Sequence, residues 1–364
     1  MSNSDTYQQP THPDEAYYRQ QRTRQSRRWG GILLVIGIIW LMFELIGRGV
    51  LWGINTGMVE HTQTVQQTVS ASVLQIKIAN DHVTIVPSEH NEIQIEATKH
   101  ASSWNRAAAD RALEDLRLDV HTQGDTASIT IVRPKHMFAV GRSPSIDLRI
   151  ALPPDTQFSI ESINGDLDVM NVTGTGRMQT VSGDIAVQQM RGALTLKTTS
   201  GEINLREHQG SLQIEAISGD VRLTDSAVAD ITASTFSGDL KLTGVTGLLQ
   251  LNTISGDITI KQAHDAQLII DSTSGDIEFT GRLIDNQPHR VSTISGDVEL
   301  RLPSNSNLRL DVNTLSGDIE TTLDLRDSEH DRRTLTGIVG TGGATLSIDT
   351  TSGDVSIKTE RAAR

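Results

Sequence analysis

The chain has 364 residues, a formal net charge of −13 and no cysteine. The missing cysteines exclude a disulfide framework, a thiol nucleophile and a cysteine metal site. The acidic balance argues against nucleic acid as a partner, because phosphate binding needs a basic surface. Aromatic residues make up 3% of the chain, so any folded core must consist mainly of Ile, Leu and Val.

Residues 1–28 are rich in Gln, Arg, Ser, Thr and Pro and contain almost no aliphatic residue. Such a segment cannot bury a core, so we expect a disordered basic tail. Residues 29–54 are mainly apolar, and a membrane span needs about 20 such residues. A signal peptide would need a small-residue cleavage site after this stretch, and none follows. We therefore predict a transmembrane helix over residues 29–54 and the lipid bilayer as a partner.

Basic residues crowd one side of this apolar stretch. Arg48 is the only Lys or Arg between the stretch's first residue and Lys77, and the arginines that precede the stretch are Arg19, Arg22, Arg24, Arg27 and Arg28. The positive-inside rule then predicts a cytoplasmic N-terminus and a C-terminal domain outside the cytoplasmic membrane. We expect a single-pass protein of that membrane.

Residues 55–70 are expected to form a linker and residues 71–157 a small strand-rich module. Alternating apolar and polar residues predict strands at 73–78, 83–86, 93–95, 118–120, 129–132 and 146–152. One helix is predicted over 103–116, with Ser103 as its N-cap. Its apolar face would hold Trp104, Ala108, Ala112 and Leu116 at helical spacing.

The tripeptide Ser-Gly-Asp, with two variants, recurs through residues 158–364. Its glycines fall at 165, 183, 201, 219, 238, 256, 275, 296, 317 and 353. Steps of 18 to 21 residues are typical of an architecture in which each unit stacks on the next. The last step of 36 is interpreted as two periods, with a degenerate copy at Thr334–Gly337.

Within one unit, apolar residues alternate along 212–216 and again, with opposite parity, along 221–223. The change of parity predicts a tight corner at Ser218, Gly219 and Asp220, with glycine at a positive φ. The expected corner glycines are Gly183, Gly201, Gly219, Gly238, Gly256, Gly275, Gly296, Gly317 and Gly353. The predicted fold is therefore all-β, a β-solenoid of stacked 18-residue repeats. A stack of antiparallel hairpins would give the same alternation.

In such a solenoid the acidic corner residues would form a column. A calcium-binding edge is one interpretation, because hard cations favour rows of carboxylates; its ligands would be Asp184, Asp220, Asp239, Asp257, Asp276, Asp297 and Asp318. The favoured interpretation is that each carboxylate bonds the backbone of its own corner, as aspartates in turns commonly do.

No strong catalytic motif is present: the chain has no Gly-x-Ser-x-Gly, no His-Glu-x-x-His and no phosphate-binding glycine loop. The eleven histidines show no metal-ligand spacing. We predict no catalytic residues, no cofactor and no enzymatic activity. Two alternatives stay open. One is a polysaccharide-acting enzyme whose carboxylates meet only in the fold, in a groove with an unrepeated charged cluster. The other is a calcium-stabilised surface rod.

The units Thr-x-Ser-Gly-Asp-[Ile/Val]-x-[Leu/Ile] run from Ser162 to Ile357, after a lead-in at Ile146–Pro153. This pattern resembles the bacterial adhesin-like, toast-rack domain family of unknown function over residues 70–360. Residues 30–37 are similar to the membrane segments of cell-wall-active antibiotic response proteins. The resemblance implies a stacked all-β fold and a role at the bacterial envelope, in adhesion or stress response, with an unidentified envelope protein or glycan as partner. It implies no catalytic residues and does not define the oligomeric state.

Overall fold

The computed structural model describes residues 59–103, 106–133 and 144–360. The predicted tail and transmembrane helix therefore lie outside the described residues, as does Trp104. Within the described part of the chain, no helix is long and apolar enough to cross a membrane. Residues 60–364 form one compact unit by themselves, and the description below concerns that unit.

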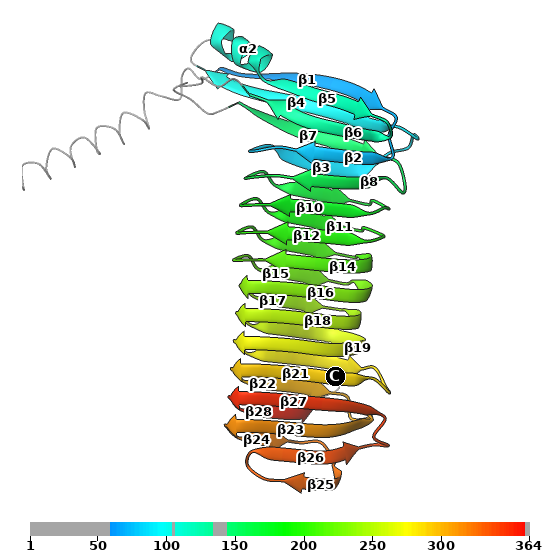
Figure 1. Ribbon diagram of the computed structural model, residues 1–364, viewed down its shortest axis with the longest axis vertical. Coiled ribbons are helices and arrows are strands. Elements are labelled where there is room, and N and C mark those ends of the chain that lie inside the picture. The colour runs from blue at the N-terminus through cyan, green and yellow to red at the C-terminus, as the bar shows by residue number, and fades with distance from the viewer. Residues whose placement is uncertain (1–58, 104–105, 134–143, 361–364) are drawn as a thin grey trace, which may run out of the picture. The chain divides into compact units, whose positions relative to one another are not determined.

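The Ser-Gly-Asp repeat folds into a parallel β-solenoid (Figure 1). Each rung contains two strands joined by the corner, and each strand pairs in parallel with its equivalents one rung away. The register equals the sequence period, since Ile185 pairs with Ile203 and Ile203 with Val221. This confirms the predicted stacking of repeats and excludes a stack of antiparallel hairpins over these rungs.

The strands of the repeat are β8 (Gln157–Glu161), β9 (Leu167–Met170), β10 (Gly176–Thr180), β11 (Ile185–Gln188), β12 (Leu194–Thr198), β13 (Ile203–Arg206), β14 (Gln209–Ala216), β15 (Val221–Thr224), β16 (Ala227–Ser237), β17 (Leu240–Thr243), β18 (Thr246–Ser255), β19 (Ile258–Ser274), β20 (Ile277–Leu283), β21 (Pro288–Ser295) and β22 (Val298–Leu302). The long strand β19 serves two rungs, because its start pairs with β17 and its end with β18.

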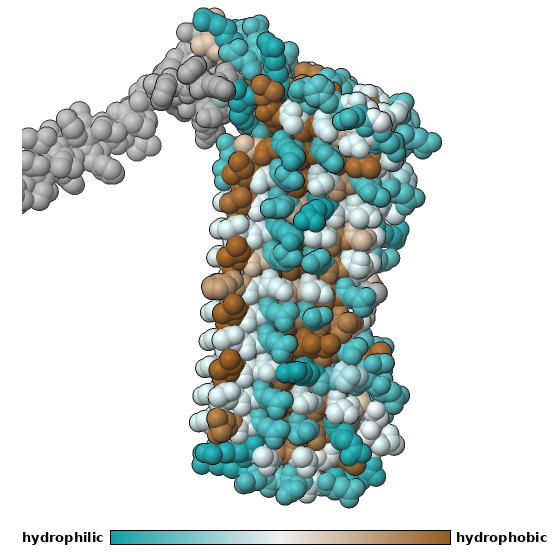
Figure 2. Space-filling view, viewed as in Figure 1, coloured by the Kyte–Doolittle hydropathy of each residue, from teal (hydrophilic) through white to brown (hydrophobic). Residues whose placement is uncertain are grey.

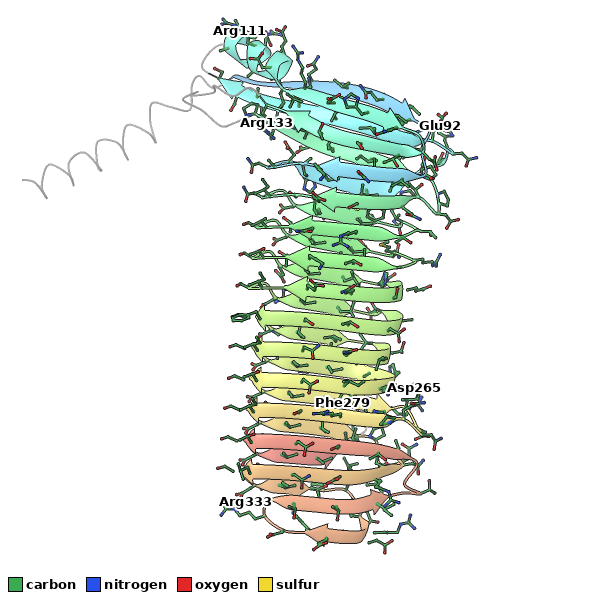
Figure 3. The ribbon with its side chains drawn as sticks, in the orientation of Figure 1. Glu92, Arg111, Arg133, Asp265, Phe279 and Arg333 are labelled. Carbon is green, nitrogen blue, oxygen red and sulfur yellow. The ribbon has the colours of Figure 1, made fainter. Side chains whose placement is uncertain are left out.

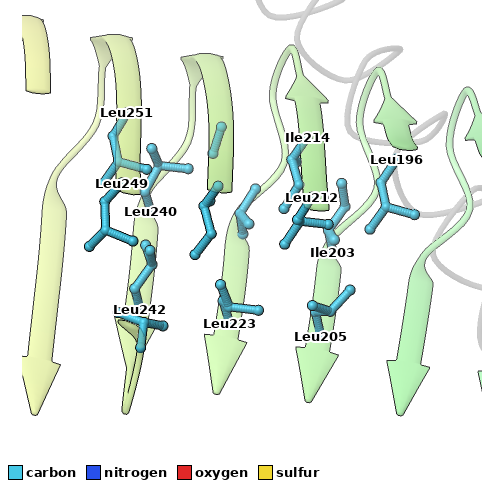
Figure 4. Close-up of a cluster of buried hydrophobic side chains, with 14 of the residues drawn as sticks. Leu196, Ile203, Leu205, Leu212, Ile214, Leu223, Leu240, Leu242, Leu249 and Leu251 are labelled. Atoms are coloured by element: carbon cyan, nitrogen blue, oxygen red, sulfur yellow. The ribbon is translucent and has the colours of Figure 1, made fainter. Parts of the chain in front are cut away.

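Aliphatic residues fill the interior in columns that follow the register. Leu205, Leu223 and Leu242 pair in sequence along one such column, and each is almost fully buried (Figure 4). Phe279 is the one phenylalanine among the fully buried side chains of the repeat (Figure 3). A single rung is too thin to bury its own apolar face, so the stacking of neighbours supplies the core.

The N-terminal strands continue the same solenoid. These elements are β1 (Val59–Val69), β2 (Val73–Lys77), β3 (His82–Pro87), β4 (Ile93–Ser103), α2 (Arg106–Asp115), β5 (Arg117–Gln123), β6 (Thr126–Val132) and β7 (Ser145–Leu152). The pair β2 and β3 forms a rung between β8 and β9 on one side and β6 and β7 on the other. The sheet therefore continues across residue 157, where a boundary between the N-terminal module and the repeat domain was predicted.

Two local expectations for this region are corrected by the structure. Most of the expected linker, residues 55–70, is strand β1, whose backbone pairs with β4. The helix begins at Arg106, not at Ser103, because Ser103 still belongs to β4. The helix buries Ala109 and Leu113 where Ala108 and Ala112 were expected.

The C-terminal rungs are stacked out of sequence order. The remaining strands are β23 (Leu308–Ser316), β24 (Ile319–Thr321), β25 (Arg326–His330), β26 (Thr334–Val339), β27 (Ala344–Ser352) and β28 (Val355–Thr359). The last repeat, β27 and β28, lies between the rung of β21 and β22 and the rung of β23 and β24. The predicted degenerate repeat at Thr334–Gly337 is instead strand β26, which runs antiparallel to β23.

Both ends of the solenoid are closed by antiparallel strands. At one end β4 pairs with β7 and β5 with β6; at the other β26 pairs with β23 and β25 with β26. The outermost strand β25 has the sequence Arg-Asp-Ser-Glu-His, and all five residues are exposed. Charged edge strands disfavour pairing with another sheet. End-to-end growth of the stack is therefore blocked by the ends themselves.

Candidate interaction surface at the Ser-Gly-Asp corner

The corner glycines lie one above another along one edge of the solenoid. A Cβ built on Gly183 would overlap the carbonyl oxygen of Gly165, and one on Gly201 would overlap that of Gly183. The same relation links each later corner glycine to its neighbour, and Gly353 stands between Gly296 and Gly317. Close backbone stacking is therefore what requires glycine along the whole column.

The expected positive φ holds for only part of this column. Gly256, Gly275, Gly296 and Gly353 have φ of 143°, 132°, 145° and 152°. Gly183 and Gly201 are not among the residues with positive φ. Glycine is needed at these two corners for space and not for a left-handed backbone.

The corners are of two kinds, distinguished by the partner of the glycine N–H. In the early rungs this N–H donates to a buried hydroxyl three residues before it, as from Gly183 to Thr180 Oγ1 (3.0 Å) and from Gly201 to Thr198 Oγ1 (2.8 Å). In the later rungs it donates to a serine carbonyl of the next rung, as from Gly256 to Ser274 (3.1 Å). The first kind of corner gives way to the second after the corner of Gly219. There Ala216, which has no hydroxyl, stands at the position of Thr180 and Thr198.

This change leaves a row of hydroxyls inside the later rungs without a partner. The buried hydroxyls at this corner position that have no hydrogen bond are those of Thr235, Thr253, Ser272, Thr293 and Thr350. In each of these five rungs the glycine N–H bonds the neighbouring rung: Gly238 to Ser255, Gly256 to Ser274, Gly275 to Ser295, Gly296 to Ser352 and Gly353 to Ser316. The orphaned hydroxyls therefore follow directly from the second kind of corner.

The acidic corner residues form a hydrogen-bonded column. Except for Glu202 and the terminal Asp318, each carboxylate accepts a bond from the backbone N–H of the acidic residue one rung further on, and not from its own corner as the sequence led us to expect. These bonds lead from Asp184 to Asp166 (3.0 Å), Glu202 to Asp184 (2.8 Å), Asp239 to Asp220 (3.1 Å), Asp257 to Asp239 (3.1 Å), Asp276 to Asp257 (2.9 Å), Asp297 to Asp276 (2.8 Å), Asp354 to Asp297 (2.8 Å) and Asp318 to Asp354 (2.8 Å).

Among the described corners, the step from Asp220 to Glu202 is the one without such a bond. The Glu202 carboxylate, one methylene further from the backbone, pairs with Arg222 instead. Hydrogen bonds to a carboxylate are stronger than those between neutral groups. The column thus links successive rungs outside the strands, which is why Asp recurs at this position.

Four members of the column have a cationic partner: Arg222 contacts Glu202 and Asp220, Lys241 contacts Asp239, and Arg332 contacts Asp318. Lys241 Nζ lies 2.9 Å from Asp239 Oδ2, and this bond, with the N–H of Asp257, lowers the pKa of the Asp239 carboxyl. The Arg332 guanidinium similarly lowers the pKa of Asp318. The described residues hold no group of three or more His, Asp or Glu side chains arranged to bind a metal ion.

The residue before each corner serine forms an exposed apolar column, here called the corner ridge. Seven of its side chains are 43% to 67% exposed: Ile163, Val181, Ile217, Phe236, Ile254, Ile294 and Leu315. Thr199, Thr273 and Thr351 occupy the same position in the other three rungs. Figure 2 shows apolar side chains at regular intervals along this edge of the solenoid. Among the described residues, seven of the ten exposed large hydrophobic side chains belong to this ridge.

The ridge was not anticipated from the sequence, although its signal is present there. The residue between the buried Thr and the corner Ser is aliphatic or aromatic in seven of ten units, where an outward-facing position should be polar. The small number of aromatic residues in the repeat region predicts recognition by hydroxyls, carboxylates and shape. The structure adds an apolar surface, with Phe236 as its exposed aromatic residue.

A groove of about 460 Å³ lies on the other face of the solenoid, across β9, β11, β13 and β15. Its charged lining residues are Asp168, Arg206 and Arg222. Asp168 lies 3.1 Å from His82 Nε2, and this hydrogen bond raises the pKa of the His82 imidazole. Hydrolysis of glycosides ordinarily uses two carboxyl groups, and the lining of this groove supplies one.

The fold and its corner define a class of protein, the parallel β-solenoid with a regular corner motif and closed ends. The sequence profile of the Toastrack DUF4097 family matches residues 71–282 and 212–358. The chain therefore belongs to the Toastrack DUF4097 family. The family match does not include residues 30–37, so their similarity to membrane segments of antibiotic response proteins stays a prediction.

Several solved structures match more than four fifths of this chain at low sequence identity. A candidate cell adhesion protein of Clostridium sporogenes is 10% identical, and the match covers 83% of this chain and 100% of that one, with a TM-score of 0.21. A candidate lipid-binding protein of Parabacteroides distasonis is 11% identical over 83% and 97%, with a TM-score of 0.38. A candidate adhesin of Bacteroides fragilis is 10% identical over 82% and 97%, with a TM-score of 0.30. No curated protein sequence matches the chain.

Proposed function

We propose that the protein is a non-catalytic, single-pass membrane protein that displays its solenoid outside the cytoplasmic membrane as an interaction surface. The corner ridge is the observation that carries this proposal. Isolated exposed apolar residues are normal on protein surfaces, but seven in one column are not scattered. Contiguous apolar patches of a few hundred Å² are typical of interaction sites.

The anchor and its orientation rest on the sequence. Residues 29–54 are long and apolar enough to span a bilayer, and five arginines precede them. An adhesin-like role or a part in envelope stress response agrees with the family resemblance. The repeated corner residues are used by the fold itself, for stacking and for hydrogen bonds between rungs, so they do not form a row of catalytic groups.

The topology can be tested with single cysteines because the natural chain has none. Ser200→Cys places a thiol on an exposed corner position. We expect an impermeant thiol reagent to label this variant on intact cells, and a cysteine replacing Ser4 in the predicted tail to react only after lysis. Protection of the Ser200→Cys thiol on intact cells, with labelling after lysis, would reverse the proposed orientation.

The role of the ridge can be tested by a triple variant, I217T/F236T/I254T. Threonine stands naturally at three ridge positions, so these substitutions should leave the fold intact. A matched control replaces three exposed glutamines on β10, β14 and β18, as Q179T/Q213T/Q250T. We expect the ridge variant, and not the control, to lose binding to envelope components in pull-downs from solubilised membranes and in adhesion of cells. Equal binding by both variants at an unchanged melting temperature would refute a role for the ridge.

A further inference from the structure

We propose that the corner ridge binds the corner ridge of a second copy of this chain, with the two solenoids side by side and pointing the same way. This inference rests on the proposed role of the ridge as an interaction surface and names its occupant. The two-fold axis of such a pair would run along the solenoid, between the facing ridges. Pairs of identical surfaces related by a two-fold axis are the commonest form of homo-oligomer.

The dimensions of the ridge suit such a contact. Ten rungs at about 4.8 Å each give a surface on the order of 40 Å long. Burying an aliphatic side chain removes roughly 100 Å² of apolar surface from water, so the half-exposed ridge side chains hold on the order of 400 Å². The exposed corner serines flank the ridge. Together they can supply an interface near the standard size of about 800 Å² per partner.

The order of residues along the ridge favours the parallel arrangement. In spatial order the ridge has Ile163, Val181, Thr199, Ile217, Phe236, Ile254, Thr273, Ile294, Thr351 and Leu315. In a parallel pair each ridge residue faces the same residue of the other copy, so apolar side chains face apolar side chains and threonines face threonines. In an antiparallel pair at full overlap each threonine faces an apolar residue: Thr199 meets Ile294, Thr273 meets Ile217 and Thr351 meets Val181.

An antiparallel pair displaced by one rung in one direction also sets Phe236 against Phe236, but it leaves Leu315, the most exposed ridge residue at 67%, without a partner and sets Ile163 against Thr351. Displacement in the other direction leaves Ile163 without a partner and sets Phe236 against Thr273. The parallel pair sets Phe236 against Phe236 near the middle of the ridge with every level matched. Aromatic pairs contribute beyond the area they bury, and anchors near the centre of an interface carry much of its affinity.

The acidic column supports the same choice. A ridge residue lies within two residues of the end of the strand before the corner, and an acidic residue directly precedes the strand after it, so the two columns lie on opposite sides of the corner. An axis along the solenoid places the acidic columns of the two copies on opposite flanks of the interface. An axis across the solenoid would bring both columns to the same flank, where like charges repel. Anchors on one side of a membrane would also require the parallel arrangement.

The test uses the full-length chain in membranes and single cysteines at equivalent ridge levels. We expect Thr199→Cys and Thr273→Cys each to form a covalent dimer on oxidation or with a short bis-maleimide. Gln188→Cys, exposed on the other face, is the control and should stay monomeric. Adding I217T/F236T/I254T to Thr199→Cys should reduce the dimer at least several-fold, whereas adding Q179T/Q213T/Q250T should not.

Two results would overturn the parallel pair. One is dimer yield for Thr199→Cys and Thr273→Cys no higher than for Gln188→Cys. The other is preferential linking of Thr199→Cys to Ile294→Cys in cells that express both, which would show the antiparallel pair. If cross-linking is absent while the ridge variant still loses envelope binding, the ridge binds a different molecule and the proposed function stands. If neither property changes, both proposals fail.

Discussion

The backbone N–H of Asp354 donates a hydrogen bond of 2.8 Å to Oδ1 of Asp297, although 57 residues separate the two in the chain. Asp354 in turn accepts a 2.8 Å bond from the backbone N–H of Asp318. The acidic column thus passes through the last repeat before it reaches the repeat that precedes it in sequence. Lys358 adds a contact of 3.3 Å to Glu299 across the same step. The C-terminal repeat is an internal rung of the solenoid.

Removal of residues 344–364 should therefore damage more than the end of the stack. β22 loses one of its two pairing partners and β24 loses its partner β28. Stability in a solenoid depends on such contacts between neighbouring rungs. We expect limited proteolysis to cut within residues 288–330, while residues 157–260 stay protected. Removal of residues 361–364 alone is the control. A cleavage pattern unchanged by the longer truncation would contradict the inserted position of the last repeat.

The two kinds of corner predict that replacing the buried threonine by valine has opposite effects on stability in the early and the later rungs. Thr198→Val removes the acceptor of the Gly201 N–H and should destabilise the protein by about 1–2 kcal/mol. Thr253→Val replaces a buried hydroxyl without a partner by a methyl group of similar size. It should be neutral or stabilising, since an unpaired buried polar group is costly. Urea unfolding of both variants measures the difference, and equal losses would contradict the two kinds of corner.

The acidic column can be tested at Asp276, whose Oδ1 accepts the Asp297 N–H at 2.8 Å. Asp276→Ala loses this bond and should cost about 1 kcal/mol. Asp276→Asn keeps an acceptor oxygen and should stay within about 0.5 kcal/mol of the natural protein, with a gain at low salt where repulsion between carboxylates is strongest.

Asp276→Asn also tests whether bound calcium stabilises the solenoid. A ligand bound to the folded state alone must raise the melting temperature, so a chelator would destabilise the natural protein if the column held calcium. We expect no effect of chelator at low ionic strength. A chelator effect that is present in the natural protein and absent in Asp276→Asn would favour the calcium rod.

Stacking of glycine backbones predicts a strong effect at Gly201. A Cβ there overlaps the carbonyl oxygen of Gly183, and the backbone of a stacked rung cannot yield without loss of pairing. We expect Gly201→Ala to cost roughly 3 kcal/mol or more. Gly343→Ala is the control, because its Cβ meets its nearest atom at an ordinary 3.4 Å. Comparable melting temperatures for the two variants would argue against glycine stacking.

Burial lowers the pKa of His289. Its Nδ1 accepts the Leu268 N–H at 3.3 Å, and its Nε2–H donates to the Ile284 carbonyl at 3.0 Å. The folded protein therefore holds the neutral imidazole, while the unfolded chain takes up a proton near pH 6.5. Stability should be complete above pH 6.5 and fall as the pH drops below it, towards the lowered folded pKa.

His289→Gln should remove part of this pH dependence, and His208 should contribute in the same direction because burial also lowers its pKa. Melting temperatures between pH 7.5 and 5 measure the slope for the natural protein and the variant. His121→Gln, which alters an exposed histidine, is the control. Identical slopes for His289→Gln and the natural protein would contradict the role of burial.

Much of the fold could be predicted from local pattern. The alternation at 73–78 and 146–152 predicts strands that the structure contains as β2 and β7. The end strands were harder to predict, since β1 and β25 have few apolar residues and owe their conformation to pairing with a neighbour. The sequence shows the apolar residues of the corner ridge but not that they are exposed, because their exposure depends on the geometry of the corner.

The sequence by itself determined the period and the residues that face the core, and the structure decided for parallel pairing over a stack of antiparallel hairpins. A regular step of about 18 residues aligns each aliphatic position with its equivalent one rung away, as Ile185 and Ile203 show. Only the tertiary structure decided the order of the end rungs and the partner of each corner glycine. The physical reason is that the edges of all rungs offer the same backbone groups and the same aliphatic columns. Which rung sits beside which is then decided by the antiparallel end strands and the connections that they allow.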